Sequence, residues 1–206
     1  TAYDVIIQKA NNYPTEFISE VTFNTITTSS QYPGSIQFDR NVTLNNDTHF
    51  NTSVIANLSS ASANSISAVD KTISFQSLTL KKPLTINCAD LTFKDNVKTS
   101  ASDTSSNYLK INGNFKTNGS PISIESDIML NGNYNGNSNS GHTTFEGNLY
   151  IFGSETSEIT LEEVTVSKDL IFDAPRPKNT KGTIKAQNIV LYRGTIKAAD
   201  SSKLQA

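Results

Sequence analysis

The side chains that most often carry catalysis are few and scattered in this sequence. Its 206 residues include two histidines, His49 and His142, which stand far apart in polar stretches. That separation gives little reason to expect a metal site or a nucleophilic triad. The single cysteine, Cys88, is in phase with the apolar residues Leu84 and Ile86. We therefore expect a small buried hydrophobe there, and one cysteine excludes an intrachain disulfide.

The acidic residues also lack a catalytic arrangement. Glu162 and Glu163 form the one adjacent acidic pair, and neighbours on a strand point to opposite faces. Asp90, Asp127 and Asp169 each stand directly before an apolar residue, as residues at strand corners do. We therefore predict that the protein is not an enzyme and that it needs no cofactor and no metal.

Composition narrows the classes of partner. The net charge is −2, the isoelectric point is near 5.7, and no basic cluster exceeds two adjacent lysines, so we expect no nucleic acid partner. No apolar run approaches the roughly 18 residues of a membrane span, so none is expected in this segment. Hydrophobic residues make up 35% of the chain, a low share for a compact globule. A thin core under a wide polar surface suits a solenoid.

A repeated four-residue phrase must position these side chains. It reads polar, apolar, any residue, apolar. The copies begin at Glu20, Asn41, Ser77, Asp90, Asp127, Asn148, Asp169 and Asn188. Several copies are 21 residues apart, and a fixed period near twenty in short strand-like phrases is typical of stacked solenoids.

The period predicts an all-β fold: a single parallel β-helix solenoid of about nine coils with loop excursions. The usual chirality of crossovers makes it right-handed. We assign residues 1–19 to an N-terminal cap segment and residues 20–206 to the β-helix domain. A sandwich of hairpins is the alternative, because Asn-Gly steps within residues 131–141 permit a local hairpin. The apolar phase resets at each corner, which favours the β-helix.

The third residue of the phrase points outward and is the candidate binding site. It is Thr at residues 22, 43, 79 and 92, and then becomes apolar in Met129, Tyr150, Ile171 and Val190. An apolar row on an outer surface indicates a partner, a ligand or a covering loop. Tyr192 would widen the row. The loop 131–145, which contains Tyr134 and Phe145, either contributes to this site or folds back over it.

The phrases and the polar loops resemble known surface proteins. Runs such as Asn148-Leu149-Tyr150-Ile151, with few cysteines, resemble autotransporter passenger domains and related bacterial adhesins. The run from Gly147 to Ile151 also resembles repeats of tapirin-type cellulose-attaching proteins. Both resemblances imply a bacterial surface protein that binds without catalysis. Pectin hydrolases on β-helices carry paired aspartates, Gly-His-Gly and Arg-x-Lys, and here only Ser140-Gly141-His142-Thr143 approaches that set.

We therefore expect a non-enzymatic extracellular or cell-surface adhesion module. It would bind a polysaccharide, a host cell or another partner surface through its outer sheet face and loops. A cellulose-type attachment protein and a polysaccharide lyase or hydrolase are the alternatives. A third is a spacer rod that associates with itself through the apolar row.

Overall fold

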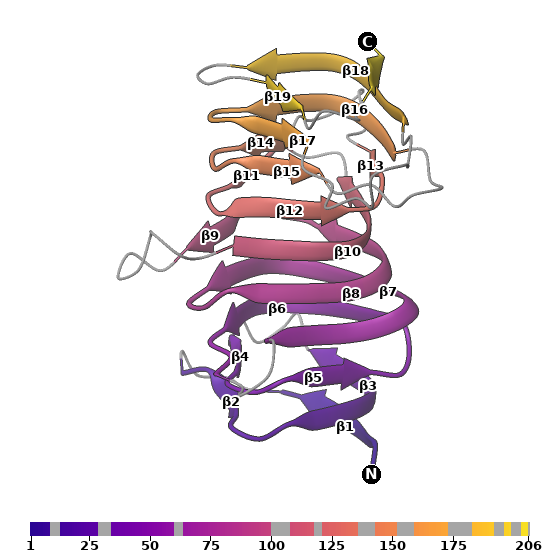
Figure 1. The fold of residues 1–206 in the computed structure, drawn as a ribbon. Coiled ribbons are helices and arrows are strands. Elements are labelled where there is room, and N and C mark those ends of the chain that lie inside the picture. Colours follow the sequence, from indigo (N-terminus) through magenta and orange to yellow (C-terminus); the bar gives the residue numbers. More distant parts are fainter. Residues whose placement is uncertain are drawn as a thin grey trace.

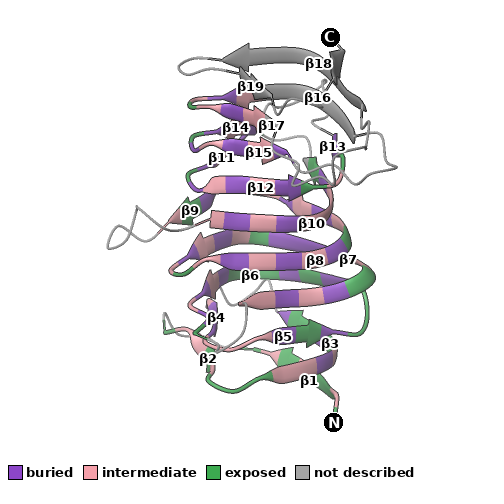
Figure 2. Ribbon diagram, in the orientation of Figure 1, coloured by how far each residue is buried: buried purple, intermediate pink, exposed green. Residues whose placement is uncertain are grey.

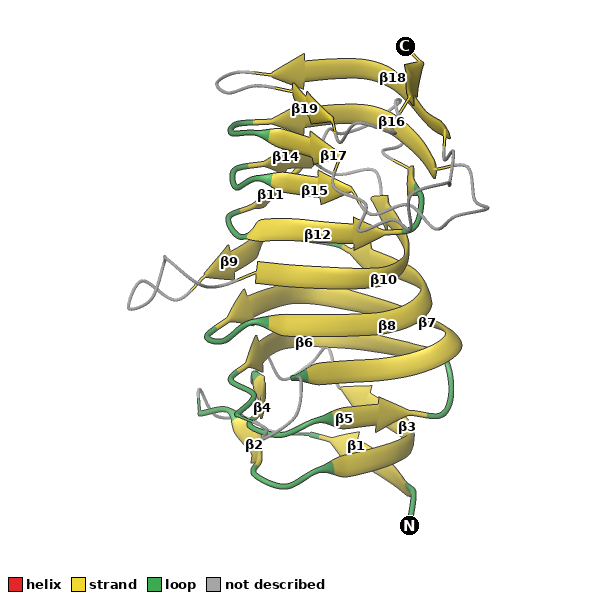
Figure 3. Cartoon of the chain, viewed as in Figure 1, coloured by secondary structure: helices red, strands yellow, loops and turns green. Residues whose placement is uncertain are grey.

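A computed structural model gives the fold of the chain. It describes residues 1–8, 13–28, 34–59, 64–99, 108–117, 121–135, 143–151, 159–172, 183–191, 196–198 and 203–205. Side chains are described within these ranges up to residue 171, except at 117, 135 and 159–164. All the regular elements in these ranges are β-strands joined by short loops (Figure 3).

The strands follow one another around three faces of a coil. The first ten are β1 (Tyr3–Ile7), β2 (Thr15–Phe17), β3 (Val21–Thr28), β4 (Ile36–Phe38), β5 (Val42–Leu44), β6 (Thr48–Ala56), β7 (Ser65–Leu80), β8 (Leu84–Phe93), β9 (Val97–Thr99) and β10 (Tyr108–Thr117). The others are β11 (Ile122–Ile124), β12 (Asp127–Asn131), β13 (Tyr134–Asn135), β14 (Thr143–Phe145), β15 (Leu149–Ile151), β16 (Ile159–Val166), β17 (Leu170–Phe172), β18 (Thr183–Leu191), β19 (Ile196–Ala198) and β20 (Lys203–Gln205).

Each strand pairs in parallel with the strand one turn away, so the chain is a parallel β-solenoid, as predicted (Figure 1). We call its three sides faces A, B and C. Face A holds β5, β12, β15, β17 and β19, face B holds β13 and β20, and face C holds β2, β4, β9, β11 and β14. The longer strands bend around corners from one face to the next. About six turns have side chains described on all three faces, slightly fewer than the nine or so coils expected.

Side chains alternate between the interior and the outside along every face (Figure 2). One interior row on face A runs through the residues Val42, Ile66, Ile86, Ile111, Leu130 and Ile151. These six side chains are at most 1% exposed. The apolar positions of the phrase therefore form the core.

The corners explain how long strands change face. In β7 the register with β8 shifts between Ala68 and Thr72, and Asp70 there adopts a φ of 61°. Asp tolerates this left-handed conformation better than most residues. In β10 the corner falls at Gly113, with a φ of 153°, where a Cβ would overlap the backbone carbonyl oxygen of Cys88. Only glycine fits this close approach.

A column of aromatic rings runs through the interior. Its rings contact one another in sequence, with centroids 5.1–6.4 Å apart, through Phe17, Phe23, Phe38, Phe50, Phe75, Phe93, Phe115, Tyr134 and Phe145. Equivalent residues of successive turns lie about 4.8 Å apart, so rings at one position of the turn meet directly. Ring pairs of this kind stabilise the folded state by more than the burial of their apolar area alone.

Two stretches that the phrase describes poorly also join the stack. β1 pairs with β3 and β2 pairs with β4, so residues 3–7 and 15–17 form an end coil. An end coil can also serve as a cap, and a domain boundary at residue 20 stays a prediction. Within residues 45–70, β6 and the start of β7 pair with their neighbours like the other strands.

Candidate binding surface on face A

The apolar row lies where the strand register of face A brings it together. Met129 on β12 pairs with Tyr150 on β15, which pairs with Ile171 on β17. The row continues to Lys110 on β10 in one direction and to Lys197 on β19 in the other. We call these five positions the platform row. Beyond Lys110 the same line of strand partners reaches Thr85 and Ser65.

The three apolar side chains of the platform row are half-buried, in contrast to the buried residues on either side of Met129 and Tyr150. Ile128 and Leu130, which flank Met129, are fully buried in the core. Two rung spacings separate Met129 from Ile171, so the apolar centre of the row is about 10 Å long. The row therefore changes from polar to apolar along the stack, with Tyr150 in the middle.

The strand register excludes Val190 from the platform row. Val190 pairs with Thr165 of β16, which pairs with Thr144 of β14 on face C. The interpretation of the eight phrases as one series was therefore wrong in part, because the phrases that begin at 77, 90 and 188 lie on other faces than those at 127, 148 and 169. Tyr192 lies outside the described residues.

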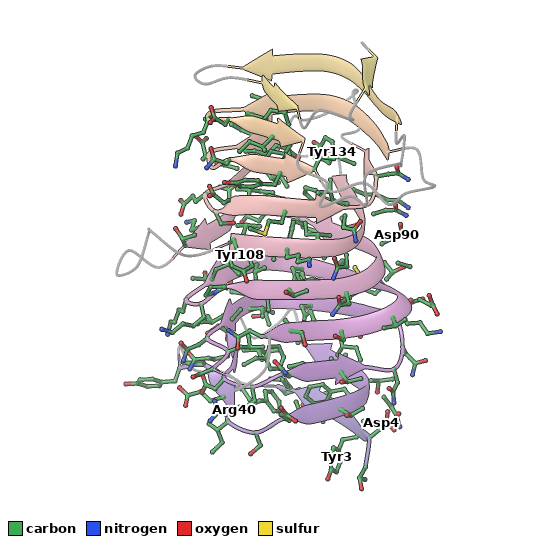
Figure 4. The ribbon with its side chains drawn as sticks, viewed as in Figure 1. Tyr3, Asp4, Arg40, Asp90, Tyr108 and Tyr134 are labelled. Atoms are coloured by element: carbon green, nitrogen blue, oxygen red, sulfur yellow. The ribbon has the colours of Figure 1, made fainter. Side chains whose placement is uncertain are left out.

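Tyr134 lies inside the solenoid (Figure 4). Its side chain is 1% exposed and its ring contacts the rings of Phe115 and Phe145, which are both fully buried. Tyr134 pairs with Leu161 of the next turn on face B. Tyr134 and Phe145 therefore belong to the aromatic column, and neither forms or covers the platform row. The sequence did not predict this position, because Tyr134 stands in a stretch rich in Asn and Gly that is typical of a loop.

Polar side chains border the platform row on one side. The corner row comprises the residues Tyr108, Asp127, Asn148 and Asp169, each two positions before a platform residue. Asn148 donates from its backbone N to Oδ1 of Asp127 at 2.8 Å and from Nδ2 to Oδ2 at 3.2 Å. The backbone N of Asp169 donates to Oδ1 of Asn148 at 3.2 Å. These bonds hold the carboxylates and amides beside Met129 and Tyr150.

A ladder of amides lies on the other side of Lys110 and Met129, two positions after each, and continues beside Thr85 and Ser65. The amide row comprises the residues Ser67, Asn87, Asn112 and Asn131, which are strand partners in this order. Asn87 Nδ2 donates to Ser67 Oγ at 2.9 Å, and Asn112 Nδ2 donates to Asn87 Oδ1 at 2.7 Å. The Asn131 bond to Asn112 Oδ1 is longer, at 3.5 Å. Parallel stacking thus gives an asparagine ladder on face A.

The lysines and the amide row were not identified as part of the site from the sequence. Tyr108, which stands before Leu109, is not the polar residue that begins the phrase, and the run Thr195-Ile196-Lys197-Ala198 fits the phrase but was not counted among its copies. An alignment on the apolar–any–apolar core alone would have placed Lys110 and Lys197 in the series.

A second polar feature lies on face B. An open hollow of about 450 Å³ is lined by the residues His49, Asn51, Thr72, Ser74, Thr92 and Lys94. Ser74 Oγ and His49 Nδ1 are hydrogen-bonded at 2.8 Å. Asp47 accepts a 2.7 Å bond from the backbone N of Thr72. An activated serine needs a base that a third group orients, and the contacts described for His49 include no carboxylate.

Comparison of the chain with models of protein families, with curated proteins and with solved structures finds no match. The described residues contain no helix long and apolar enough to cross a membrane. In the same residues, no group of three metal-ligating side chains could hold a metal ion.

Proposed function

We propose that this protein is a non-enzymatic binding module of an extracellular or cell-surface protein, acting through the platform row and its polar borders. The supporting observation is one continuous row in which Met129, Tyr150 and Ile171 stay half-buried. Aromatic side chains such as Tyr150 are frequent energetic centres of binding surfaces.

The resemblance to autotransporter passengers and adhesins supports this proposal at the level of the β-solenoid, which presents long flat faces. The tapirin-type resemblance, which implies attachment to polysaccharide, supports the same class of function. The ligand would be a polysaccharide or a host or partner surface.

The test is binding of the purified protein to cells and to a glycan panel. Tyr150→Ala and Ile171→Asp should each weaken binding about tenfold or more, because each alters the middle of the contact. Ile55→Asp is the matched control, since Ile55 is also a half-buried outward residue but lies on face C. Unchanged binding in both face A variants, with far-UV circular dichroism intact, would reject the platform row as the site.

An enzyme of the polysaccharide lyase or hydrolase class is the second candidate, favoured by the Ser74–His49 bond in the face B hollow. Incubation with pectin-like and other polymers, with and without calcium, tests it. Product release that Ser74→Ala and His49→Gln both abolish would establish the enzyme and overturn the first proposal.

Self-association through the platform row is the third candidate. Sedimentation of the wild type and of Ile171→Asp distinguishes it, because a homotypic contact would give an oligomer that the charged variant dissociates. A monomer at high concentration would exclude it.

A further inference from the structure

We infer that the ligand of face A is an uncharged glycan chain that lies along the long axis of the solenoid, across successive rungs. This inference rests on the proposed function and adds the chemical class and the direction of the ligand.

Charges of both signs lie on the described part of face A. The platform row carries Lys110, and the corner row carries Asp127 and Asp169. The amide row is neutral. A polyanion would face Asp127 and Asp169, and a polycation would face Lys110, so neither meets a surface of one sign. An uncharged ligand meets no such repulsion.

The polar groups beside the apolar centre suit hydroxyl groups. Carboxylate oxygens accept hydrogen bonds, and side-chain amides both donate and accept. Asp127 and Asn148 lie on one side of Met129 and Tyr150, while on the other side Asn131 follows Met129 and Asn112 follows Lys110. A sugar ring has an apolar face and a rim of hydroxyl groups. It can therefore cover Met129 with its face while its rim reaches both polar rows, and the next ring along the axis covers Tyr150 beside Asn148.

The direction follows from the order of the side chains. Along a strand, Met129 is flanked by the inward residues Ile128 and Leu130, and the next outward positions, Asp127 and Asn131, are polar. Along the axis, the apolar centre continues through three rungs, about 10 Å. Only a chain that runs along the axis stays on apolar side chains.

The experiment compares retention on insoluble neutral polysaccharides, including cellulose, chitin and mannan, with retention on immobilised heparin and polygalacturonate. We expect retention on at least one neutral polymer, unchanged from about 0.05 to about 0.5 M NaCl, because binding of an uncharged ligand is not screened by salt. Retention on the anionic polymers alone, or retention abolished by salt, would overturn the inference.

Substitutions at one position separate the alternatives further. Lys110→Tyr lengthens the apolar row by one rung and removes a cation, so it should strengthen binding of a neutral chain by about threefold. Lys110→Gln removes the cation without lengthening the apolar row, so it should bind a neutral chain more weakly than Lys110→Tyr does. Thr79→Tyr, which adds a tyrosine at an outward position of face C, is the control. Weaker binding in both Lys110 variants would show an anionic ligand and overturn the inference.

Different results would reject the platform row as the binding site and the uncharged glycan as its ligand. If Tyr150→Ala and Ile171→Asp abolish binding to cells while no neutral polymer retains the protein, the platform row stands and the uncharged glycan is wrong. If neutral polymers retain the protein and both variants bind them as the wild type does, face A is not the site and both levels fail.

Discussion

Cys88 and Asp90 stand two positions apart at a corner of β8, and their surroundings shift their pKa values in opposite directions. Burial, with a smaller contribution from the negative charge of Asp90, raises the pKa of the Cys88 thiol to about 12. A hydrogen bond from Lys116, together with one from Asn114 and the charge of Lys116, holds the pKa of Asp90 below its usual value against partial burial. Both shifts lead to measurable behaviour.

The Cys88 thiol should react slowly with a thiol reagent at about pH 8 in the folded protein, because the thiolate is the reactive species and is scarce so far below the raised pKa. Guanidinium-unfolded protein is the control and should react fully within the usual time of an exposed cysteine. Equal rates in the two states would contradict burial of Cys88.

Asp90 and Lys116 form an ion pair with 2.9 Å between Oδ2 and Nζ. This pair should make the stability of the fold decrease at acid pH. Because the pKa of folded Asp90 is lowered, its stabilising contribution is complete above the unfolded value near 4 and is lost as the pH falls through the folded value. Asp90→Asn should flatten the fall in melting temperature in that window. The effect should be small, since the pair is partly exposed.

Lys116→Met removes the same pair from its other side. It should flatten the pH dependence as Asp90→Asn does, and the double variant should add nothing further. A profile as steep as that of the wild type in all three would show that the pair does not carry this acid sensitivity.

At the scale of elements, rows of equivalent residues connect strands of successive turns, which a single strand of three to five residues cannot do. On face A, β12 contributes Ile128 and Leu130 to the core, Met129 to the platform row and Asn131 to the amide row. The amide row couples β7, β8, β10 and β12 through side-chain bonds parallel to those of the backbone. The strands thus also bind one another through their outer surfaces.

Asn112 is the centre of this ladder and makes a bond on each side. Asn112→Ala should lower the free energy of unfolding by about 1–2 kcal/mol, since a neutral hydrogen bond contributes about 0.5–1.5 kcal/mol net. Asn131→Ala, which removes only the 3.5 Å bond, is the matched control and should cost less. Urea unfolding followed by circular dichroism measures both, and an equal cost would mean that the ladder adds no stability.

At the scale of the whole molecule, the stack is an elongated rod with the chain ends at opposite ends of its axis (Figure 1). Each turn contacts the turns before and after it, so distant substitutions should act independently. The aromatic column is the interior counterpart of this arrangement, because every ring meets rings of neighbouring turns.

Phe75 and Leu149 test this independence, since both are fully buried and lie several turns apart on different faces. Phe75→Ala should cost about 3–5 kcal/mol and Leu149→Ala about 2–5 kcal/mol. In the double variant the costs should add within about 0.5 kcal/mol. Phe50→Ala with Phe75→Ala, whose rings stack at 5.1 Å, should deviate from additivity. If the two double variants deviated equally from additivity, stability would not depend mainly on contacts between neighbouring turns.

The sequence alone determined the class of the fold and the interior positions of the strands that carry the phrase. The period of 21 residues and the apolar–any–apolar pattern are local properties, and they predicted parallel stacking and the buried positions of these strands from Phe23 to Leu170. It also predicted the pairing of Met129, Tyr150 and Ile171, because the three lie at equal intervals with no change of face between them.

The tertiary structure alone decided which phrases share a face. Loops of unequal length make the same phrase fall on face A at Asn148 and on face C at Asn188, so spacing could not show that Val190 leaves the row. It also placed Tyr134 in the core, Lys110 and Lys197 at the two ends of the platform row, and the amide row beside Lys110 and Met129. Side-chain alternation fixes only whether a side chain points inward or outward. Which residues of successive turns become its neighbours depends on where the chain bends.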